Sequence, residues 1–466
     1  MTANSLQALL DQAKNPVDML RNAQAGPYVY PVVPTEFSNW RDEQNSWTES
    51  CILFNQSYHM MDMYLEGPDA LRLLTDIGVN SMKNFTIDKA KQFVACTHDG
   101  FVVGDMVLIY LGENRFTLIG RPPTNNWVQY HAEKGGYDVK FERDERAAQQ
   151  SGPIRRKVYR YQVQGPNALR LMEAVTGVPT PDLKFFNVTH FNVKGHTVHA
   201  LRHGMAGQAG YEIWGPWEEG DAVREAIVEA GGAFGLHQAG SRTYSSNTLE
   251  SGWIPSPLPA IYEGEALRAY REWLPATGYE ARASLGGSFV SENIRDYYLT
   301  PWDLGYGSFV KFDHDFIGRG ALEEIAKNPR RKKVTLALDD DDVVAAIATQ
   351  FGKGKQRAKY MDMPSSVYSA HPFDAVLSNG KNVGLSTWIG YSSNERRMLS
   401  LAMVDLEQAE PGTEVTLLWG EPDGGSNKPT VESHAQVEIK AIVSPVPYSE
   451  VARKSYADGW RTAQPA

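Results

Sequence analysis

The chain has 466 residues, of which 42% are hydrophobic, and a formal net charge of −10. This length suffices for two or three domains with a large core, and the negative charge argues against a nucleic-acid partner, because phosphate contacts need clustered Lys and Arg. Two cysteines, Cys51 and Cys96, give no disulfide framework, and no apolar run approaches the roughly 18–20 residues of a membrane span. The first residues lack the basic and apolar regions of a secretory signal, so we expect a soluble, cytoplasmic enzyme without a membrane or nucleic-acid partner.

Residues 1–45 are predicted to form an N-terminal arm. Helical spacing occurs over Ser5–Leu10 and again over Val17–Asn22. A proline-punctuated, extended segment then contains Tyr28 and Tyr30. Residues two apart on a strand face the same side, so these two tyrosines can present their hydroxyls to one cavity; a plain surface strand is the alternative.

Two stretches, Trp47–Tyr137 and residues 158–235, share one plan of strands and helices. The elements expected in the first are a strand at Met63–Glu66, a helix at Pro68–Thr75 and a strand at Met106–Leu111. Those expected in the second are a strand at Arg160–Val163, a helix at Pro166–Val175, strands around Val193–Leu201 and Tyr211–Trp214, and a helix at Asp221–Ala230. The repetition predicts two related α+β halves of one catalytic unit, which we place at residues 46–330.

The remainder of the chain, residues 331–466, is predicted to form a separate domain. After a helix at Gly264–Trp273, the pattern changes to short strands between turn-rich segments, at Lys332–Leu338, Leu399–Val404 and Glu414–Trp419. The acidic run Asp339–Asp342 is predicted to be a solvated turn, with a metal site as the alternative. We expect no metal site, because no Cys/His cluster has the spacing of metal ligands.

One motif is more informative than any other. Lys311–Leu322 has the sequence KFDHDFIGRGAL, which resembles the K-x-x-DFIGRxAL signature of the glycine-cleavage aminomethyltransferases, the T-protein family. Those enzymes move one-carbon units to or from a folate nitrogen. Further segments resemble the family's motifs in the family's order, and together they cover roughly residues 45–445: Ile87–Gln92 with Asp99–Asp105, Val163–Ala168, Ala209–Trp214, Gly240–Gly252 and Gly390–Ala402.

The resemblance implies an α+β aminomethyltransferase fold, with three domains around a central folate channel and a C-terminal β-barrel. It also implies tetrahydrofolate as cosubstrate. Glu212 matches the family glutamate that pairs with the pterin ring, and a carboxylate can accept two parallel hydrogen bonds from an amino-pyrimidine edge. Asp105 matches an aspartate near the reacting folate nitrogen, although Gly104 stands where the family commonly has a second aspartate; a turn aspartate is the alternative. Arg242 aligns with an arginine near the folate, and Trp253 could stack on an aromatic ring or serve as core.

Departures from the T-protein pattern resemble one branch, the tetrahydrofolate-dependent aromatic O-demethylases that act on vanillate and syringate. An insertion of two residues beyond Arg242 introduces Tyr244, which puts the glycine-cleavage reaction in doubt. The resemblance to this branch extends from about residue 15 to 462. Its motifs are Tyr28–Val33, Glu36–Arg41, Arg202–Gly207 and Ser246–Ala260.

The reaction of that branch makes chemical demands that particular residues can meet. Arg121 is a suitable anchor for the substrate carboxylate, since a guanidinium binds a carboxylate in a planar fork. The leaving group is a phenolate, and Tyr244 and His59 are the candidates to meet its developing charge, although a core histidine is the usual interpretation of a position such as 59. Further substrate contacts are expected from Tyr28, Tyr30 and Gln56.

We therefore predict transfer of the methyl group of a methoxybenzoate to tetrahydrofolate, giving 5-methyltetrahydrofolate. The vanillate-type enzymes of that branch carry His-His where this chain has Tyr58-His59. A changed neighbour could resize the pocket, which favours syringate, yielding 3-O-methylgallate, over vanillate or 3-O-methylgallate as substrate. The other hypotheses are a folate-dependent demethylase of an aliphatic donor and a folate-binding module without methyl transfer. The sequence lacks the Gly-x-Gly-x-x-Gly fingerprint of a flavin domain, which counts against an amine-oxidising version of the aliphatic demethylase. The oligomeric state stays open.

Overall fold

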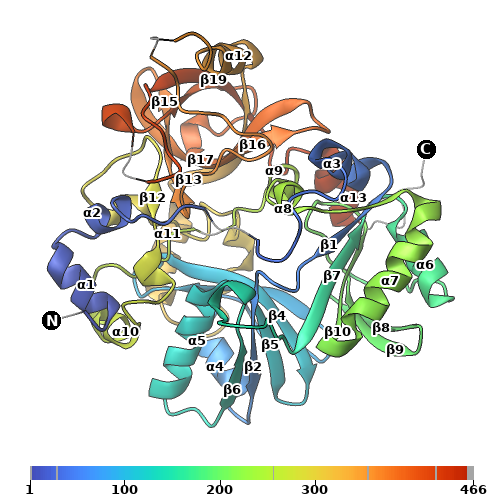
Figure 1. The fold of residues 1–466 in the computed structure, drawn as a ribbon. Helices are drawn as coiled ribbons and strands as arrows, with labels where there is room; N and C mark the ends of the chain where they lie inside the picture. Colours follow the sequence, from blue (N-terminus) through green and yellow to red (C-terminus); the bar gives the residue numbers. More distant parts are fainter. Residues whose placement is uncertain (1–2, 28–29, 256, 354–355, 426–427, 459–466) are drawn as a thin grey trace.

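The computed structural model describes residues 3–27, 30–255, 257–353, 356–425 and 428–458. Two sheets and a barrel organise these residues (Figure 1). The first sheet has the order β3-β4-β5-β2-β6 and is antiparallel throughout. Its strands are β2 (Met61–Glu66), β3 (Ala90–Cys96), β4 (Val102–Gly112), β5 (Arg115–Gly120) and β6 (Lys140–Asp144).

The second sheet has the order β11-β1-β7-β10-β9-β8, in which β1 and β11 pair in parallel. Its strands are β1 (Cys51–Asn55), β7 (Val158–Gln164), β8 (Val188–Val193), β9 (His196–Leu201), β10 (Gly210–Pro216) and β11 (Leu236–Gln238). The helices on the outer faces are α4 (Ala70–Ile77) and α5 (Pro122–Lys134) for the first sheet, and α6 (Ala168–Thr176) and α7 (Gly220–Gly231) for the second (Figure 1). Two helices therefore cover the outer face of each sheet.

Alternation along the strands explains why the two sheets face each other. On β7, Tyr159 and Tyr161 pack into the apolar cluster beneath α6 and α7, whereas Arg160 and Gln162 occupy the opposite face and are also buried. Strand residues that point inward from both sheets then form a shared apolar cluster. Its members include Ile109 and Ile119 of the first sheet and Val188, Leu201 and Trp214 of the second. A sheet with a polar, buried inner face is what positions a site between the two halves.

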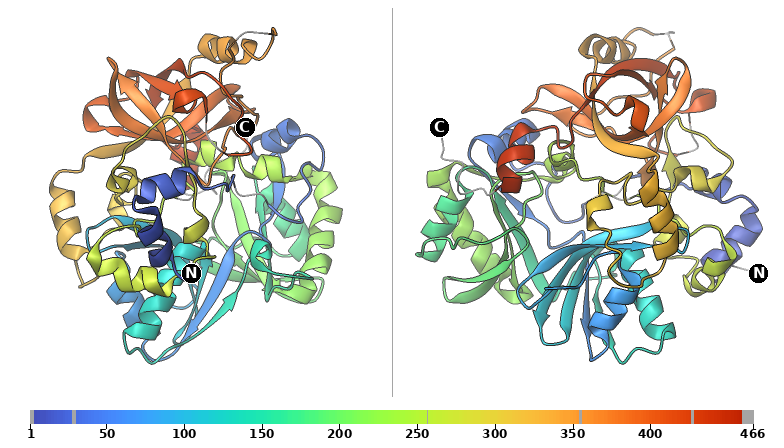
Figure 2. Two further views of the ribbon diagram at one scale, coloured as in Figure 1. Left: turned by 60° about the vertical axis from the view of Figure 1, so that its left-hand side comes forward. Right: turned by 180° about the vertical axis from the view of Figure 1, so that it is seen from behind.

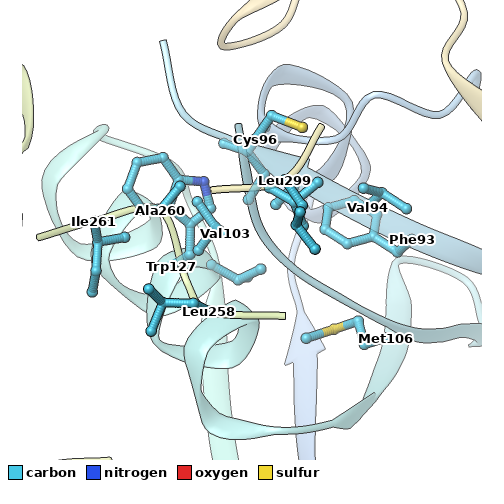
Figure 3. Packing of buried hydrophobic residues seen from close by; sticks show 14 of the residues in the cluster. Phe93, Val94, Cys96, Val103, Met106, Trp127, Leu258, Ala260, Ile261 and Leu299 are labelled. Carbon is cyan, nitrogen blue, oxygen red and sulfur yellow. The ribbon is translucent and has the colours of Figure 1, made fainter. Parts of the chain in front are cut away.

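The segment that follows the second sheet packs back onto the first. In Figure 3, Phe93 of β3 and Val103 of β4 lie in one core with Trp127 of α5, and with Leu258 and Leu299 from later in the chain. The helices of this segment are α8 (Ser241–Tyr244), α9 (Asn247–Ser251), α10 (Arg268–Trp273) and α11 (Arg319–Lys327). The motif Lys311–Leu322 thus leads into α11, which begins at Arg319.

The C-terminal strands close into a barrel, which confirms the predicted β-barrel domain (Figure 2). The barrel order is β13-β17-β16-β15-β18-β19. Its strands are β13 (Arg331–Leu338), β15 (Asp374–Ser378), β16 (Lys381–Ser392), β17 (Arg397–Asp405), β18 (Glu414–Trp419) and β19 (Val437–Ser444). The remaining elements are the short pair β12 (Leu285–Gly286) and β14 (His371–Pro372), with helices α12 (Asp340–Ala348) and α13 (Glu450–Asp458).

Two local predictions are wrong. The acidic run is not a turn: Asp339 caps α12, its side chain accepts a hydrogen bond from the Asp342 amide, and the following acids lie in the first helical turn. Carboxylates are favourable there because the N-terminal end of a helix carries partial positive charge. The segment after Tyr30 is also not a strand. Residues 31–33 bend, Val32 has a φ of 74°, and the flanking prolines lack the amide hydrogen that a strand ladder requires.

The arm begins with the two predicted helices, α1 (Leu6–Ala13) and α2 (Pro16–Arg21), and continues to α3 (Trp40–Glu49). Helix α1 lies beside α10, and α3 lies beside α8 at the edge of the second sheet (Figures 1 and 2). The arm therefore packs both on the segment that follows β11 and on the edge of the second sheet. Among the helices of the described residues, none combines the length and the apolar character that crossing a membrane requires.

Candidate active site

A cavity of about 380 Å³ lies between the two sheets. Its walls come from several parts of the chain that are distant in sequence. The lining includes Tyr30 of the arm, Gln56 and His59 after β1, Asp105 of β4, Arg121 after β5, Glu212 of β10, and Tyr244 and Trp253 from the segment after β11. These are the predicted site residues, except Tyr28 and Arg242. The cavity therefore brings together side chains that sequence resemblance placed in two groups, substrate and folate.

An aromatic cluster forms one part of the cavity. Tyr244 Oη lies 2.8 Å from His59 Nε2, and the two rings pack edge to face at 4.7 Å between centroids. Tyr30 packs on both, at 4.4 Å from the Tyr244 ring and 4.9 Å from the His59 ring. The arm is thereby part of the wall.

Burial fixes the protonation of this pair. Desolvation, followed by the charges of Arg121 and other arginines, holds the pKa of His59 well below its ordinary value. Burial and the neighbouring Tyr30 raise the pKa of Tyr244 well above its ordinary value. A neutral imidazole and a protonated phenol follow, and the imidazole tautomer decides which of the two donates across the contact of 2.8 Å. His59 Nδ1 is buried and has no hydrogen-bond partner among the described residues.

Met205 contacts the Tyr244 hydroxyl, and Gln56 contacts Met205. Met205 Sδ lies 3.3 Å from Tyr244 Oη and 2.8 Å from the Nε2 of Gln56. The Gln56 amide also donates to Gln162 Oε1 at 3.1 Å. Gln56 is therefore fixed by β7 of the second sheet and in turn fixes the thioether beside the Tyr244 hydroxyl.

Glu43 of α3 sets the position of the helix that carries Tyr244. Its Oε1 accepts hydrogen bonds from the amides of Phe37 and Ser38, at 2.7 and 2.9 Å. Its Oε2 accepts from the Gly240 amide at 2.8 Å and from Thr243 Oγ1 at 2.7 Å. The carboxylate is fully buried, so four hydrogen bonds compensate its desolvation. The arm and α8 are consequently locked to one another.

Glu212 is the end of a buried chain of ion pairs. Its Oε1 accepts from Arg160 Nη1 at 2.8 Å, and Arg160 Nη2 donates to Asp62 at 2.6 Å. Asp62 also pairs with Arg156 at 2.8 Å, and Arg156 pairs with Asp144 at 2.9 Å. Burial opposes the charge of Arg160, but Asp62 and Glu212 outweigh it and raise the pKa of the guanidinium. Glu212 Oε2 accepts no hydrogen bond from the described residues, so it is available to a ligand in the cavity.

Asp105 has a different environment, made of neutral donors. Its Oδ2 accepts from Gln92 Nε2, from Tyr306 Oη at 3.0 Å and from Trp253 Nε1 at 3.3 Å. Desolvation raises the pKa of the Asp105 carboxyl, against the effect of these hydrogen bonds and of Arg121. The adjacent Gly104 explains the missing second aspartate of the family pattern, because a Cβ there would lie 2.4 Å from Thr124 Oγ1.

Three sequence-based expectations need correction or completion. Arg242 is absent from the cavity lining: its guanidinium pairs with Glu36 at 2.8 Å and donates to the Met363 carbonyl. Tyr58 is absent from it as well, because its ring packs edge to face on Trp217 at 5.8 Å. The argument that Tyr58 resizes the pocket therefore loses its basis. Tyr28 lies outside the described residues.

The cavity also contains residues that the sequence did not single out. His203 and Met205 belong to the Arg202–Gly207 motif, which the resemblance flagged without giving its members a role. Burial lowers the pKa of His203, although Glu212 opposes this effect. Further aromatic members of the wall that the sequence did not single out include Phe185, Phe186, Tyr279 and Tyr306. No pattern in the sequence marks these four, since each lies in a connecting segment outside the motifs.

Comparison with known proteins matches this architecture. The GCVT N-terminal domain matches residues 20–256. The syringate O-demethylase of Sphingobium sp. (strain NBRC 103272 / SYK-6) is 56% identical over 460 residues, which are 99% of each chain. The sesamin methylene transferase of Sinomonas sp. (strain No.22) is 29% identical over 414 residues, 86% of each chain.

A solved structure has the same fold. The glycine cleavage system aminomethyltransferase T from Bartonella henselae aligns with a TM-score of 0.60 at 18% identity, covering 95% of this chain and 96% of that one. The predicted α+β aminomethyltransferase fold is thereby confirmed. The domain match and the full-length relatives lead to one conclusion: this chain belongs to the GCVT family of aminomethyltransferase-like proteins.

Proposed function

We propose that the protein is a tetrahydrofolate-dependent O-demethylase of methoxybenzoates, with syringate as substrate and 3-O-methylgallate as product. The observation that carries the proposal is the buried hydrogen bond of 2.8 Å between Tyr244 and His59, in a cavity that also contains Arg121 and Glu212. The relative with 56% identity, a syringate O-demethylase, supports the choice of syringate. The sequence argument from Tyr58 no longer contributes to that choice.

The aromatic acid is proposed to bind with its carboxylate on Arg121 and its ether oxygen beside Tyr244. During the reaction the bond between the methyl carbon and the ether oxygen breaks, and a bond from that carbon to a folate nitrogen forms. The aryl oxygen becomes a phenolate, and the Tyr244 hydroxyl donates a hydrogen bond to it. Because His59 is neutral, no charge within the cluster competes with the phenolate for this donor. A preorganised donor in a dry site is worth roughly 100-fold or more in rate.

The residues around Glu212 and Asp105 fit tetrahydrofolate, which supplies nitrogen N5 as the methyl acceptor. Glu212 has one oxygen on Arg160 and the other available, and the amino-pyrimidine edge of a pterin offers hydrogen-bond donors. Phe185, Phe186 and Trp253 provide aromatic walls. The raised pKa of Asp105 suits a group that takes up the proton released from the nitrogen.

The setting of this activity is proposed to be the cytoplasm, with small molecules as the partners. Both cysteines, Cys51 and Cys96, are free and buried in the structure, which suits a reducing compartment. No metal is assigned to the mechanism.

The test is an anaerobic incubation of the purified protein with tetrahydrofolate and, separately, syringate, vanillate and 3-O-methylgallate. We expect loss of one methyl group from syringate, with an equal amount of 5-methyltetrahydrofolate formed. Dimethylglycine serves as the aliphatic donor in a fourth incubation. Folate binding without turnover of any aryl ether would overturn the proposal. In that case turnover of dimethylglycine would favour an aliphatic demethylase, and no turnover at all a binding module.

A further inference from the structure

Tyr279 forms part of the cavity wall at Arg121, and the proposed function gives it no role. Arg121 Nη1 donates to Tyr279 Oη at 3.5 Å. The guanidinium carbon of Arg146 lies over the Tyr279 ring, 5.1 Å from its centroid. One phenol therefore contacts two guanidinium groups, the first through its hydroxyl and the second over its ring.

The direction of the hydrogen bond leaves the Tyr279 proton available. Arginine only donates, so the Tyr279 oxygen accepts from Arg121 and its own hydrogen must point elsewhere. At 3.5 Å the contact is a weak hydrogen bond, and an anion placed against both groups would be a stronger partner for the Tyr279 hydroxyl. A carboxylate has two oxygens for this purpose, one for the guanidinium and one for the phenol.

Glu280 is the acidic group next to this position in sequence, and burial raises the pKa of its carboxyl. Burial works against the carboxylate form of Glu280, which is the form that would offset the positive charge of Arg121 and Arg146. Glu280 Oε1 also accepts a hydrogen bond of 2.8 Å from Asn126 Nδ2. Asn126 belongs to α5, the helix that Arg121 caps, so this bond fixes the spacing between Arg121 and Tyr279.

The arm supports the same segment from outside. The Leu6 amide donates to the Leu274 carbonyl at 2.9 Å, and the Ala276 amide donates to the Asn4 carbonyl at 3.2 Å. On the inner side, Tyr262 Oη donates to the Glu280 carbonyl at 3.0 Å. Tyr279 thus stands on a segment held on two sides, as a specificity residue requires.

We propose that Tyr279 is a specificity-determining residue that binds the carboxylate of the aromatic acid together with Arg121, and so selects aryl acids over neutral aryl ethers. This inference rests on the proposed function, because it takes Arg121 as the carboxylate anchor. It predicts that the preference for an acid over its neutral analogue depends on one hydroxyl group.

Tyr279→Phe removes that hydroxyl and keeps the ring beneath Arg146. Binding of 4-hydroxybenzoate and of neutral 4-hydroxybenzamide is measured by calorimetry, and KM and kcat are measured for syringate. We expect the Kd for the acid and the KM for syringate to rise about tenfold or more, with the Kd for the amide and the kcat changed less than about twofold. Tyr58→Phe, which alters a ring outside the cavity, is the matched control and should change none of these values.

Equal weakening for acid and amide, or no weakening for either, would overturn the proposal. Because binding is measured without turnover, the result is independent of whether the demethylase assay succeeds. Failure of the unaltered protein to bind the acid more tightly than the amide would also overturn it. A melting curve of Tyr279→Phe that matches the unaltered protein establishes that the fold is intact.

Discussion

Two buried polar regions of this molecule differ in how their charge is balanced. The ion-pair network behind Glu212 joins acids and arginines that are each less than 5% exposed, with N–O distances of 2.6–2.9 Å. The cluster at Tyr244 and His59 is equally buried but contains two neutral groups joined by one hydrogen bond. Both regions border the same cavity.

The difference assigns separate tasks to the two regions. In the network, Asp62 belongs to β2 of the first sheet and Arg160 to β7 of the second, so the ion pair between them fastens the two halves. The network contains three carboxylates and two guanidinium groups, and every one of these side chains is held by at least one ion pair. In the neutral cluster, the phenolate of the proposed reaction would be the one new charge, and the Tyr244 hydroxyl is the donor that we propose for it. The ion pairs therefore hold the two halves in position, and the neutral cluster would provide the hydrogen-bond donor of the proposed reaction.

Breaking the network should have the largest effect on stability. Arg160→Met leaves Asp62 and Glu212 buried without their shared partner, and we expect a loss of about 3–5 kcal/mol in the free energy of unfolding. Urea unfolding followed by circular dichroism measures it. The control is Lys157→Met, which removes a pair with Glu142 on the surface, where the side chains are 45% and 62% exposed. Its expected loss is under about 1 kcal/mol, and similar losses in both variants would contradict the comparison.

Breaking the neutral cluster should lower the rate of demethylation rather than the stability of the fold. Tyr244→Phe removes the hydroxyl between His59 and Met205 while retaining the ring. We expect kcat to fall roughly 100-fold to 1,000-fold, with folate affinity nearly unchanged. Single-turnover assays and folate titration separate the two quantities. Undiminished demethylation would remove Tyr244 from the mechanism.

Glu212→Gln sharpens the comparison at the point where the network meets the cavity. The amide can still accept from Arg160, but it replaces a charged acceptor for the ligand by a neutral one. We expect the Kd for tetrahydrofolate to rise about tenfold, while kcat at saturating folate stays within about threefold, since a hydrogen bond to a charged group is worth roughly 1.5–3 kcal/mol. Quenching of tryptophan fluorescence, with Trp253 in the cavity wall, reports binding. A fall in kcat at constant Kd would place Glu212 in the chemistry.

The smallest expected effect concerns Asp105, a carboxyl surrounded by neutral donors. Burial raises its pKa in the folded protein, so between the unfolded and folded pKa values the folded state binds more protons. Stability then falls as the pH rises through that window. Asp105→Asn removes this penalty and should gain roughly 0.5–1 kcal/mol at pH 7, with no gain near pH 3. Melting temperatures across this pH range test the prediction, and a gain that is independent of pH would contradict it.

Sequence patterns predicted the architecture well because they reflect local periodicity. The alternation of Arg160 and Tyr161 along one strand is visible without a structure, and so is the change to short strands beyond residue 330. The direction in which a side chain points from a turn is not visible in the sequence. Tyr58 and His59 are adjacent at the end of β1, yet one ring packs on Trp217 and the other enters the cavity.

Contacts between residues that are far apart in the sequence were the second feature that the sequence could not predict. Arg242 resembled a folate-binding arginine, but its partner Glu36 lies 206 residues away in the arm. No periodicity in either segment reveals that ion pair. Similarly, the spacing of Tyr279 to Arg121 depends on the hydrogen bond between Asn126 and Glu280, which are 154 residues apart. Residues whose position depends on a distant partner are found only from the structure. Resemblance to a family finds the residues that belong to a contiguous motif.

The hydrogen bond between Tyr244 and His59 spans 185 residues, and Tyr30 and Ala452 border the same cavity. Closing loops of this length costs entropy before the contacts give any gain, and the cavity walls come from both ends of the described chain. During synthesis on the ribosome its walls are incomplete until the C-terminal helix α13 has emerged. Ligands that bind this cavity therefore bind the complete fold alone, and at 100 times the Kd they stabilise it by about 2.7 kcal/mol. In the cell, abundance of this protein would consequently rise when its substrates are present.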